Sequence, residues 1–360
     1  MNGYDVVVVG GGIGGLTVAA LLSARGVNTC LLERQSQVGG CIGRVEFSGY
    51  DFEPGDGLYT SFGPGGIYER LFAQLPVDVP AVSLMSPPYI RRADGSDTTI
   101  AGDDLYSIVD GPASLAERLA ESIKLSGGKV RLDTPVLRLA YDESGRAIGI
   151  DLLSGERVFA KNAIVSNLTI WDTYGKLVGL NRTPPEIKKQ LNALRGSGVY
   201  VIYAVMEEAA VARLPASRMR VEDSLGQFTM AVADSAAPDG KRPVTFSTDT
   251  EVDSWFTYQS SEEDYDEWDQ AALAEFWKRV HAALPELGGD VEIIETANPR
   301  TYYDQTRRKL GMVRGIEGQP IQSYETSLSN LFIVGDTVSA AARMDSVVES
   351  AVLLADRITR

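Results

Sequence analysis

Three glycines near the N-terminus have the spacing of a phosphate-binding turn. Gly10, Gly12 and Gly15 form GxGxxG, directly after the run YDVVVVG and directly before a stretch of helical composition. The first glycine of such a turn permits the tight bend, the second lets the backbone approach a pyrophosphate, and the third lets the helix pack against a sheet. The phosphates then lie at the helix N-terminus, where unpaired N–H groups and the helix dipole favour negative charge.

Glu33 is the acidic residue that completes this motif. It closes the run VNTCLLE, 23 residues after Gly10, where a carboxylate can accept hydrogen bonds from ribose hydroxyls. Its charge would repel a 2′-phosphate, which argues against NADP at this site. Because strand, turn, helix, second strand and terminal acid all agree, the segment predicts a dinucleotide-binding site rather than a glycine-rich loop without a ligand.

The elements that position this motif follow from hydrophobic patterning. Residues 4–10 and 27–33 are predicted strands and residues 16–25 a helix ended by Gly26, which makes a βαβ unit with parallel strands. The other predicted elements are a helix over 115–126, a small β-meander from 130–140, 147–153 and 157–165, a short apolar run at 163–166, a helix over 270–284, a strand over 331–335 and a helix over 347–358.

Composition narrows the class of protein and its partners. The chain has 360 residues, which favours two domains, and its net charge of -15 makes nucleic acid and anionic membranes poor candidate partners. The ordinary interpretation of the acidic excess is solubility. Two cysteines cannot form a disulfide framework, and no Cys/His spacing indicates a metal site. No basic leader precedes the first strand and no stretch has the length of a membrane span, so we expect a cytoplasmic protein.

Residues 10–40 resemble the extended FAD fingerprint of the phytoene desaturase and flavin amine oxidase superfamily. The resemblance includes the pair Gly39-Gly40 after Glu33-Arg34, which NAD dehydrogenases do not usually carry. It continues at Gly49–Leu58 (GYDFEPGDGL), similar to a loop that passes near the flavin ring, and at 111–139, where Val136 would contact the adenine side. Near the C-terminus, Asn330–Asp336 (NLFIVGD) resembles the second FAD signature.

This resemblance implies an α/β protein with a discontinuous Rossmann-type FAD-binding domain and a smaller α+β substrate domain. The expected division is 1–60, 105–170 and 300–360 for the FAD-binding domain, and 61–104 and 171–299 for the substrate domain. The expected cofactor is FAD. The residues expected to bind it are Gly10, Gly12, Gly14, Gly15, Glu33, Arg34, Gly40, Cys41, Arg44, Gly55, Gly57, Val136, Gly335, Asp336, Ser346 and Val347.

The chain departs from the family pattern in two places. Relatives often have an arginine directly after the Gly-Gly pair, where this chain has Cys41; Arg44 could take over its contact. Cys41 itself could contact or modify the flavin, although a small packing residue is the more ordinary interpretation. The glycines usual near the C-terminus are replaced by residues 340–345, AAARMD.

The resemblance implies hydride transfer between flavin N5 and a C–H or C=C bond of a hydrophobic small molecule. Such chemistry needs a positioned substrate and a dry cavity but no protein nucleophile. The alternatives are a flavin amine oxidase, and a non-redox flavoprotein that acts as an isomerase or a binding module. No catalytic residue is identified from the sequence, and His281, the one histidine, is interpreted as a bystander on a surface helix.

Two further groups of residues have open interpretations. The aromatic residues of the middle region either line a substrate cavity or form a core, and core is favoured for most; they are Tyr200, Tyr203, Phe228, Trp255, Phe256 and Tyr258. Arg307, Arg308 and Lys309 form a short basic cluster, for which a solvated face is the simpler interpretation and an anion or substrate carboxylate site the sharper one.

Overall fold

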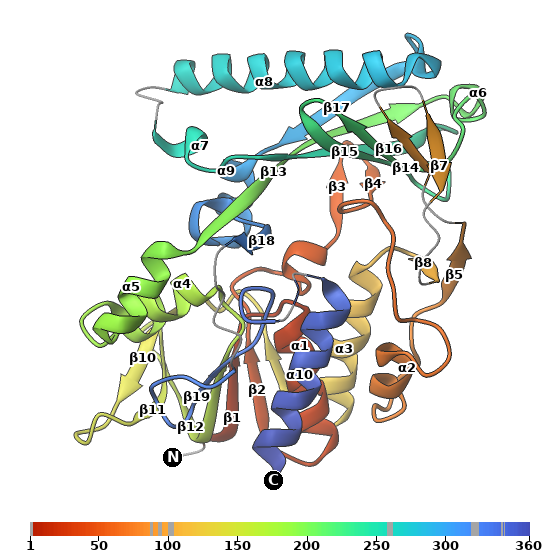
Figure 1. Ribbon diagram of the computed structural model, residues 1–360. Helices are drawn as coiled ribbons and strands as arrows, with labels where there is room; N and C mark the ends of the chain where they lie inside the picture. Colours follow the sequence, from red (N-terminus) through yellow and green to blue (C-terminus); the bar gives the residue numbers. More distant parts are fainter. Residues whose placement is uncertain are drawn as a thin grey trace.

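The chain folds into two layers, each built on a β-sheet (Figure 1). The lower sheet carries helices in front of it, and one long helix, α8, crosses the upper sheet. This computed structural model describes residues 3–86, 89–92, 96–99, 104–257, 262–317, 324–339, 341 and 343–360.

The lower sheet contains the predicted βαβ unit. Its strand order is β10-β11-β12-β1-β2-β9, with β19 beside β12. The pairs β1–β2, β1–β12, β2–β9 and β12–β19 are parallel, so the parallel pairing predicted for the first two strands is confirmed. The strands are β1 (Tyr4–Val9), β2 (Thr29–Leu32), β9 (Lys129–Arg131), β10 (Val136–Tyr141), β11 (Ala147–Leu152), β12 (Arg157–Ser166) and β19 (Leu331–Ile333).

Four helices pack on one face of this sheet and share a core with it. They are α1 (Ile13–Ala24), α2 (Ile67–Phe72), α3 (Ala113–Leu125) and α10 (Met344–Thr359). Helix α1 lies between α3 and α10 and is buried from Gly14 to Ser23, which explains why its sequence is apolar all round rather than amphipathic. A helix enclosed in this way holds the turn before it in a fixed position.

The upper sheet has the order β17-β13-β16-β15-β14-β6-β7, with β18 beside β13. Its strands are β6 (Tyr89–Arg92), β7 (Asp97–Thr99), β13 (Arg195–Met206), β14 (Arg218–Asp223), β15 (Gly226–Val232), β16 (Arg242–Thr250), β17 (Val291–Ala297) and β18 (Arg314–Glu317). Helix α8 (Glu262–Ala283) covers one face, and the hairpin of β3 (Val45–Phe47) and β4 (Tyr50–Phe52) reaches the other from the lower layer.

Short elements lie in the connections between these strands and helices. They are η1 (Gly40–Ile42), β5 (Val82–Met85), β8 (Leu105–Ile108), α4 (Ile170–Asp172), η2 (Thr173–Gly179), α5 (Pro185–Ala193), α6 (Glu208–Val211), α7 (Ser254–Thr257), η3 (Pro285–Leu287), α9 (Pro299–Thr306) and η4 (Lys309–Gly311). Among them, α9 and η4 bring the chain back from the upper sheet to the lower one.

Two predicted element boundaries were wrong for identifiable reasons. The run 130–140 is not one strand but β9 and β10, because the backbone between them turns away: the Asp133 and Thr134 N–H groups donate to the Gln35 and Glu33 carbonyls. Helix α8 begins at Glu262 rather than Gln270, since acidic residues stabilise a helix N-terminus. The run 163–166 is the end of β12.

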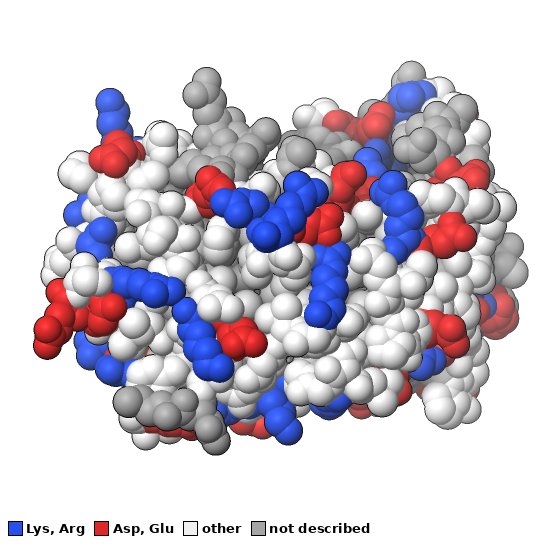
Figure 2. All heavy atoms as spheres, turned by 90° about the horizontal axis from the view of Figure 1, so that it is seen from below, with Lys and Arg blue, Asp and Glu red and all other residues white. Residues whose placement is uncertain are grey.

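The expected α/β class with a Rossmann-type layer is confirmed, and the meander β10–β11–β12 is antiparallel as predicted. Within the segment 61–104, which was assigned to the substrate domain, α2 packs in the core of the lower layer, whereas β6 and β7 join the upper sheet. Figure 2 views the molecule from below; basic and acidic side chains are interspersed on that face, so the negative net charge is not gathered there into one patch.

Candidate functional site

The turn Gly10–Gly15 has a conformation that only glycine permits. Gly10 has φ +100°, and a Cβ on Gly15 would lie 2.2 Å from the Gly10 carbonyl oxygen. A Cβ on Gly12 would lie 2.7 Å from Asn167 Nδ2. Helix α1, which is described throughout, has neither a side-chain cap nor an acidic residue in its first turn, so its first N–H groups remain available to an anion. The turn therefore fits a pyrophosphate.

Glu33 is held rigidly at the carboxyl end of β2. Its Oε2 accepts the Gly11 N–H at 2.6 Å, and its Oε1 accepts the Gln35 N–H at 2.8 Å. Each carboxylate oxygen can accept more than one hydrogen bond, so both keep capacity for ribose hydroxyls. The Thr134 N–H donates to the Glu33 carbonyl oxygen, which brings the start of β10, and with it Val136, towards the same strand end.

The Gly39-Gly40 pair returns the chain to the glycine turn. The Gly39 N–H donates to the Gly11 carbonyl at 2.8 Å, and a Cβ on Gly40 would lie 3.4 Å from Gly12 Cα. Cys41 follows directly and is exposed, in contrast to Cys30, which lies in the core.

The second FAD signature meets the turn from the other side. Gly335 has φ +134°, and a Cβ there would lie 3.3 Å from Asn167 Oδ1. Asp336 forms a two-point ion pair with Arg308, at 2.6 and 3.2 Å. Asn167 thus lies between the glycine turn and Gly335. We name Gly10–Gly15, Glu33, Gly39–Cys41, Asn167, Arg308 and Gly335–Asp336 together the glycine-turn site.

The start of α10 also reaches this region. Val347 Cγ1 lies 3.1 Å from where a Cβ on Gly14 would be. Before it, Asp345 accepts hydrogen bonds from Thr60 and Ser61 at 2.7 and 3.0 Å and pairs with Arg343 at 2.6 Å. Burial works against ionisation of Asp345, but these partners outweigh it and lower its pKa.

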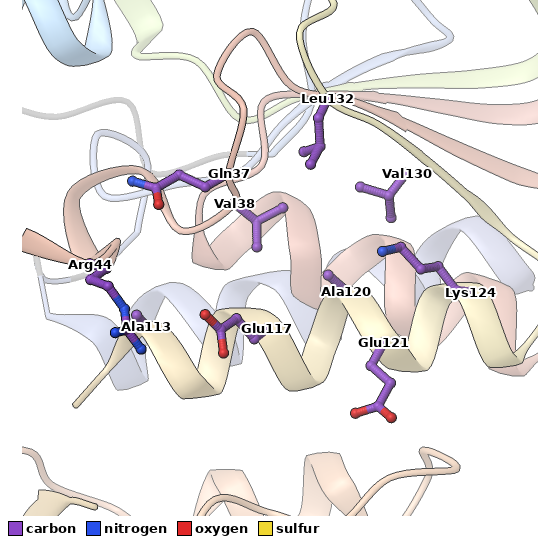
Figure 3. A pocket seen from close by; sticks show the side chains of 10 residues that line it. All are labelled: Gln37, Val38, Arg44, Ala113, Glu117, Ala120, Glu121, Lys124, Val130 and Leu132. Carbon is purple, nitrogen blue, oxygen red and sulfur yellow. The ribbon is translucent and has the colours of Figure 1, made fainter. Parts of the chain in front are cut away.

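Other expected residues lie apart from the turn. Arg44 pairs with Asp51 at 3.5 Å and lies beside Ala113 and Glu117 at one end of a pocket of about 310 Å³ along α3 (Figure 3). The Arg34 guanidinium donates to the Gln305 carbonyl.

The loop after β4 carries Gly55 and Gly57 to the upper sheet. A Cβ on Gly57 would lie 3.0 Å from Arg218 Nε and 3.4 Å from the Glu53 carboxyl carbon, whereas Gly55 faces open space. Glu53 Oε2 and Arg218 Nε are both buried without a hydrogen-bond partner. Burial raises the pKa of Glu53 to about 7, with Arg218 opposing the rise and Asp234 and Asp56 adding to it.

The structure places most of the aromatic residues of the middle region, and the histidine, whose roles the sequence left open. Tyr200, Phe228 and Trp255 form the core under α8 with Phe256 packed against it, whereas Tyr203 faces the β3–β4 hairpin. Tyr258 lies outside the described residues. His281 is a half-buried residue of α8 whose ring contacts Trp277. Among the described residues no cluster of metal-binding side chains occurs.

The basic cluster divides among three environments. Arg307 is exposed and pairs with Asp304, Arg308 enters the glycine-turn site, and the Lys309 ammonium lies over the Trp171 ring. Sequence reasoning named Arg308 only within a cluster that was either a solvated face or an anion site, and it did not name Asn167 as a site residue. Neither residue belongs to the glycine motif. The available signals were that Asn167 directly follows a strand and that Arg308 lies where the chain was expected to re-enter the FAD-binding domain.

Two models of known protein families match this chain. Residues 8–75 match the model of an NAD(P)-binding Rossmann-like domain, and residues 93–359 match that of the flavin containing amine oxidoreductases. The chain belongs to the flavin containing amine oxidoreductase family. Its cofactor is FAD, and the uncapped helix, the glycine turn and the free capacity of Glu33 fit that cofactor. The superfamily resemblance is confirmed.

Relatives with described activities match only in part. The chain is 25% identical over 272 residues to the chloroplastic prolycopene isomerase of Daucus carota, covering 69% of this chain and 43% of that protein. It is 37% identical over 108 residues to the carotenoid 3,4-desaturase of Haloarcula japonica, covering 29% of this chain and 21% of the other. The family member described here thus spans less than half the length of the prolycopene isomerase.

Solved structures share the fold over the whole chain. An oxidoreductase from Methanosarcina mazei superposes with a TM-score of 0.70 at 16% identity, covering 98% of this chain and 99% of that one. Putrescine oxidase bound to putrescine gives a TM-score of 0.68 at 13% identity and complete coverage of both. At these identities the likeness concerns the fold. No helix among the described residues combines the length and the apolar character needed to cross a membrane.

Proposed function

We propose that this protein is an FAD-dependent oxidoreductase that transfers a hydride between a C–H or C=C bond of a hydrophobic small molecule and flavin N5. The observation that carries the proposal is the glycine turn with its uncapped helix and Glu33, in a chain of the flavin containing amine oxidoreductase family. The proposed cofactor-binding residues are those of the glycine-turn site together with Arg34, Val136, Ser346 and Val347.

The flavin supplies a ring atom that accepts or returns the hydride. The chain's own residues have three tasks: to bind, to orient and to exclude water. The glycine turn and Glu33 bind the adenosine diphosphate half. The N-terminus of α10, next to Gly14 through Val347, offers a positive dipole end to negative charge that develops nearby.

A buried apolar cluster at the junction of the two layers would shield a hydrophobic substrate bound beside it from water. The face of β13 opposite α8 presents Val199, Val201 and Tyr203, which pack with Phe52 of the hairpin. Phe47 and Phe52 each lie 5.1 Å from the Tyr203 ring, measured between centroids. Apolar side chains here would exclude water from a hydride transfer. We also propose the upper sheet and α8 as the substrate domain and the cytoplasm as the compartment.

A spectroscopic titration tests this function. The full chain should purify yellow. Its visible flavin band should bleach in the absence of oxygen when a polyene that can still be dehydrogenated is added. Bleaching by amines, with hydrogen peroxide formed on admission of air, would favour an amine oxidase instead. Colourless protein that cannot be reconstituted with FAD would refute both.

A second function, isomerisation without net electron transfer, is favoured by the similarity to prolycopene isomerases. To separate the two, the flavin is first reduced without oxygen and a cis-configured polyene is then added. Isomerisation converts the polyene while the flavin spectrum stays that of the reduced form. Reduction of a double bond, by contrast, returns the oxidised flavin band in proportion to the product.

A further inference from the structure

The glycine-turn site would bring the two phosphates of FAD close to acidic side chains. Glu33 and Asp336 are acidic, FAD brings a pyrophosphate, and the whole chain has a net charge of -15. A helix N-terminus contributes the equivalent of only about half a positive charge. A fixed side-chain cation is therefore expected close to the turn.

Three arginines are candidates for this cation: Arg34, Arg44 and Arg308. Arg34 is directed to the Gln305 carbonyl, and Arg44 is exposed, pairs with Asp51 and lies along α3 (Figure 3). Arg308 is different. Its Nη atoms reach both Asp336 oxygens at 2.6 and 3.2 Å, its Nε donates to the Met312 carbonyl at 2.7 Å, and only 17% of its side chain is exposed.

A chain of contacts connects Arg308 to the glycine turn. The Gly39 N–H donates a hydrogen bond to the Gly11 carbonyl, and the backbone of Gly40 lies close to Gly12. Cys41 is the next residue. Arg308 pairs with Asp336, and the neighbouring Gly335 lies against Asn167, whose side chain also lies against Gly12 and Gly14. The guanidinium is thus held, through Asp336, next to the segment that meets the glycine turn.

The backbone around Arg308 is held in an unusual conformation. Arg307 and Leu310 both have positive φ, at +56° and +51°, although neither is glycine. Such conformations cost about 1–3 kcal/mol each and persist only where surrounding contacts enforce them. Here the Lys309 N–H donates to Asp172 at 3.2 Å, and Lys176 Nζ donates to the Arg307 carbonyl at 3.3 Å. The segment is fixed on both sides of Arg308, as a ligand-binding residue requires.

We propose that Arg308 is the cation that binds the pyrophosphate of FAD, supplied from the returning segment after α9 in place of an arginine at position 41. This inference rests on the proposed cofactor site. Asp336 orients the guanidinium, and the remaining N–H donors of the planar group serve the phosphate oxygens.

Binding of nucleotide fragments tests the assignment. Adenosine and ADP are titrated by calorimetry into the full chain freed of flavin, since the two differ in the phosphates. Arg308→Ala should weaken ADP binding by about tenfold to a hundredfold, the usual range for a lost charged hydrogen bond, and leave adenosine binding within about twofold. Arg307→Ala, the matched control beside it, should bind both as the parent protein does.

Two further variants separate a charge from a structural role. Arg308→Lys should retain part of the ADP affinity. The double variant with Cys41→Arg and Arg308→Ala should regain most of that affinity. Its holoprotein should also retain FAD in 0.5 M salt. Unchanged ADP binding in Arg308→Ala, equal losses of ADP and adenosine, or no recovery in the double variant would each overturn the assignment. A parent chain that binds neither ADP nor FAD would instead refute the proposed function.

Discussion

The glycine-turn site has two sides that are built in different ways. One side is backbone: the turn Gly10–Gly15 and the Gly39-Gly40 pair contact each other through main-chain atoms, within about thirty residues of sequence. The other side is made of the charged side chains of Arg308 and Asp336, which come from the last sixth of the chain. The backbone side depends on the absence of Cβ atoms, whereas the side-chain side depends on the balance of charge. The two sides should therefore fail differently when they are altered.

The largest effect is expected on the backbone side, from Gly15→Ala. Its Cβ would lie 2.2 Å from the Gly10 carbonyl oxygen, and backbone cannot move aside as a side chain can. We expect a loss of about 3 kcal/mol in the free energy of unfolding, together with loss of FAD, measured by thermal denaturation and the visible spectrum. Gly289→Ala, where no atom lies within 4 Å, is the control. A Gly15→Ala protein as stable as that control would contradict the backbone interpretation.

A dependence of stability on pH is expected from Glu53, a buried acid at the junction of the layers that is not part of the glycine-turn site. Burial raises its pKa from 4.5 to about 7, so the folded state holds a proton that the unfolded chain has released. The stabilisation is complete below pH 4.5 and is lost as pH rises through 7, in total about 3 kcal/mol. Glu53→Gln should flatten this dependence and be the more stable protein at pH 8, as seen from unfolding midpoints.

The exposed Glu46 on β3 supplies the control for that experiment, because Glu46→Gln should keep the parent pH dependence. If the Glu53→Gln protein lost stability between pH 4.5 and 7 as steeply as the parent, the protonated state of Glu53 would be ruled out.

A smaller effect is expected from Glu33→Gln, because the Glu33 side chain accepts hydrogen bonds from the backbone of the glycine turn. The amide keeps the shape of the carboxylate, but only its oxygen can accept, so one of the hydrogen bonds from the Gly11 and Gln35 N–H groups is lost and the other is weakened, as is acceptance from a ribose. FAD affinity should fall about tenfold, as measured by release of flavin fluorescence. Glu143→Gln, in an exposed turn, should have no effect. Equal affinities of the two variants would show that Glu33 has no part in cofactor binding.

The smallest effect is expected from Arg44→Ala. Arg44 pairs with Asp51 in an exposed position, and such pairs contribute about 0–1 kcal/mol. The dissociation constant of FAD should change by less than about twofold. A tenfold loss would mean that Arg44, rather than Arg308, is the arginine that compensates the phosphates.

The sequence predicted what depends on neighbouring residues. The strand Tyr4–Val9, the buried helix after it and the position of Glu33 follow from local patterning, and each was predicted to within a few residues. The length of α8 and the break between β9 and β10 were not predicted, because hydrogen bonds to Glu33 and Gln35 decide the latter from about a hundred residues away.

The sequence by itself determined the glycine turn, the acid that faces it, the parallel βαβ unit and the family, since all of these are encoded in short segments with fixed spacing. Only the tertiary structure decided which basic residue pairs with Asp336, that Asn167 lies between the glycine turn and Gly335, and that Tyr203 faces the junction while Tyr200 faces α8. The physical reason is that a pattern reports main-chain conformation, whereas the partner of a charge depends on which distant segments the fold brings within a few ångströms of it.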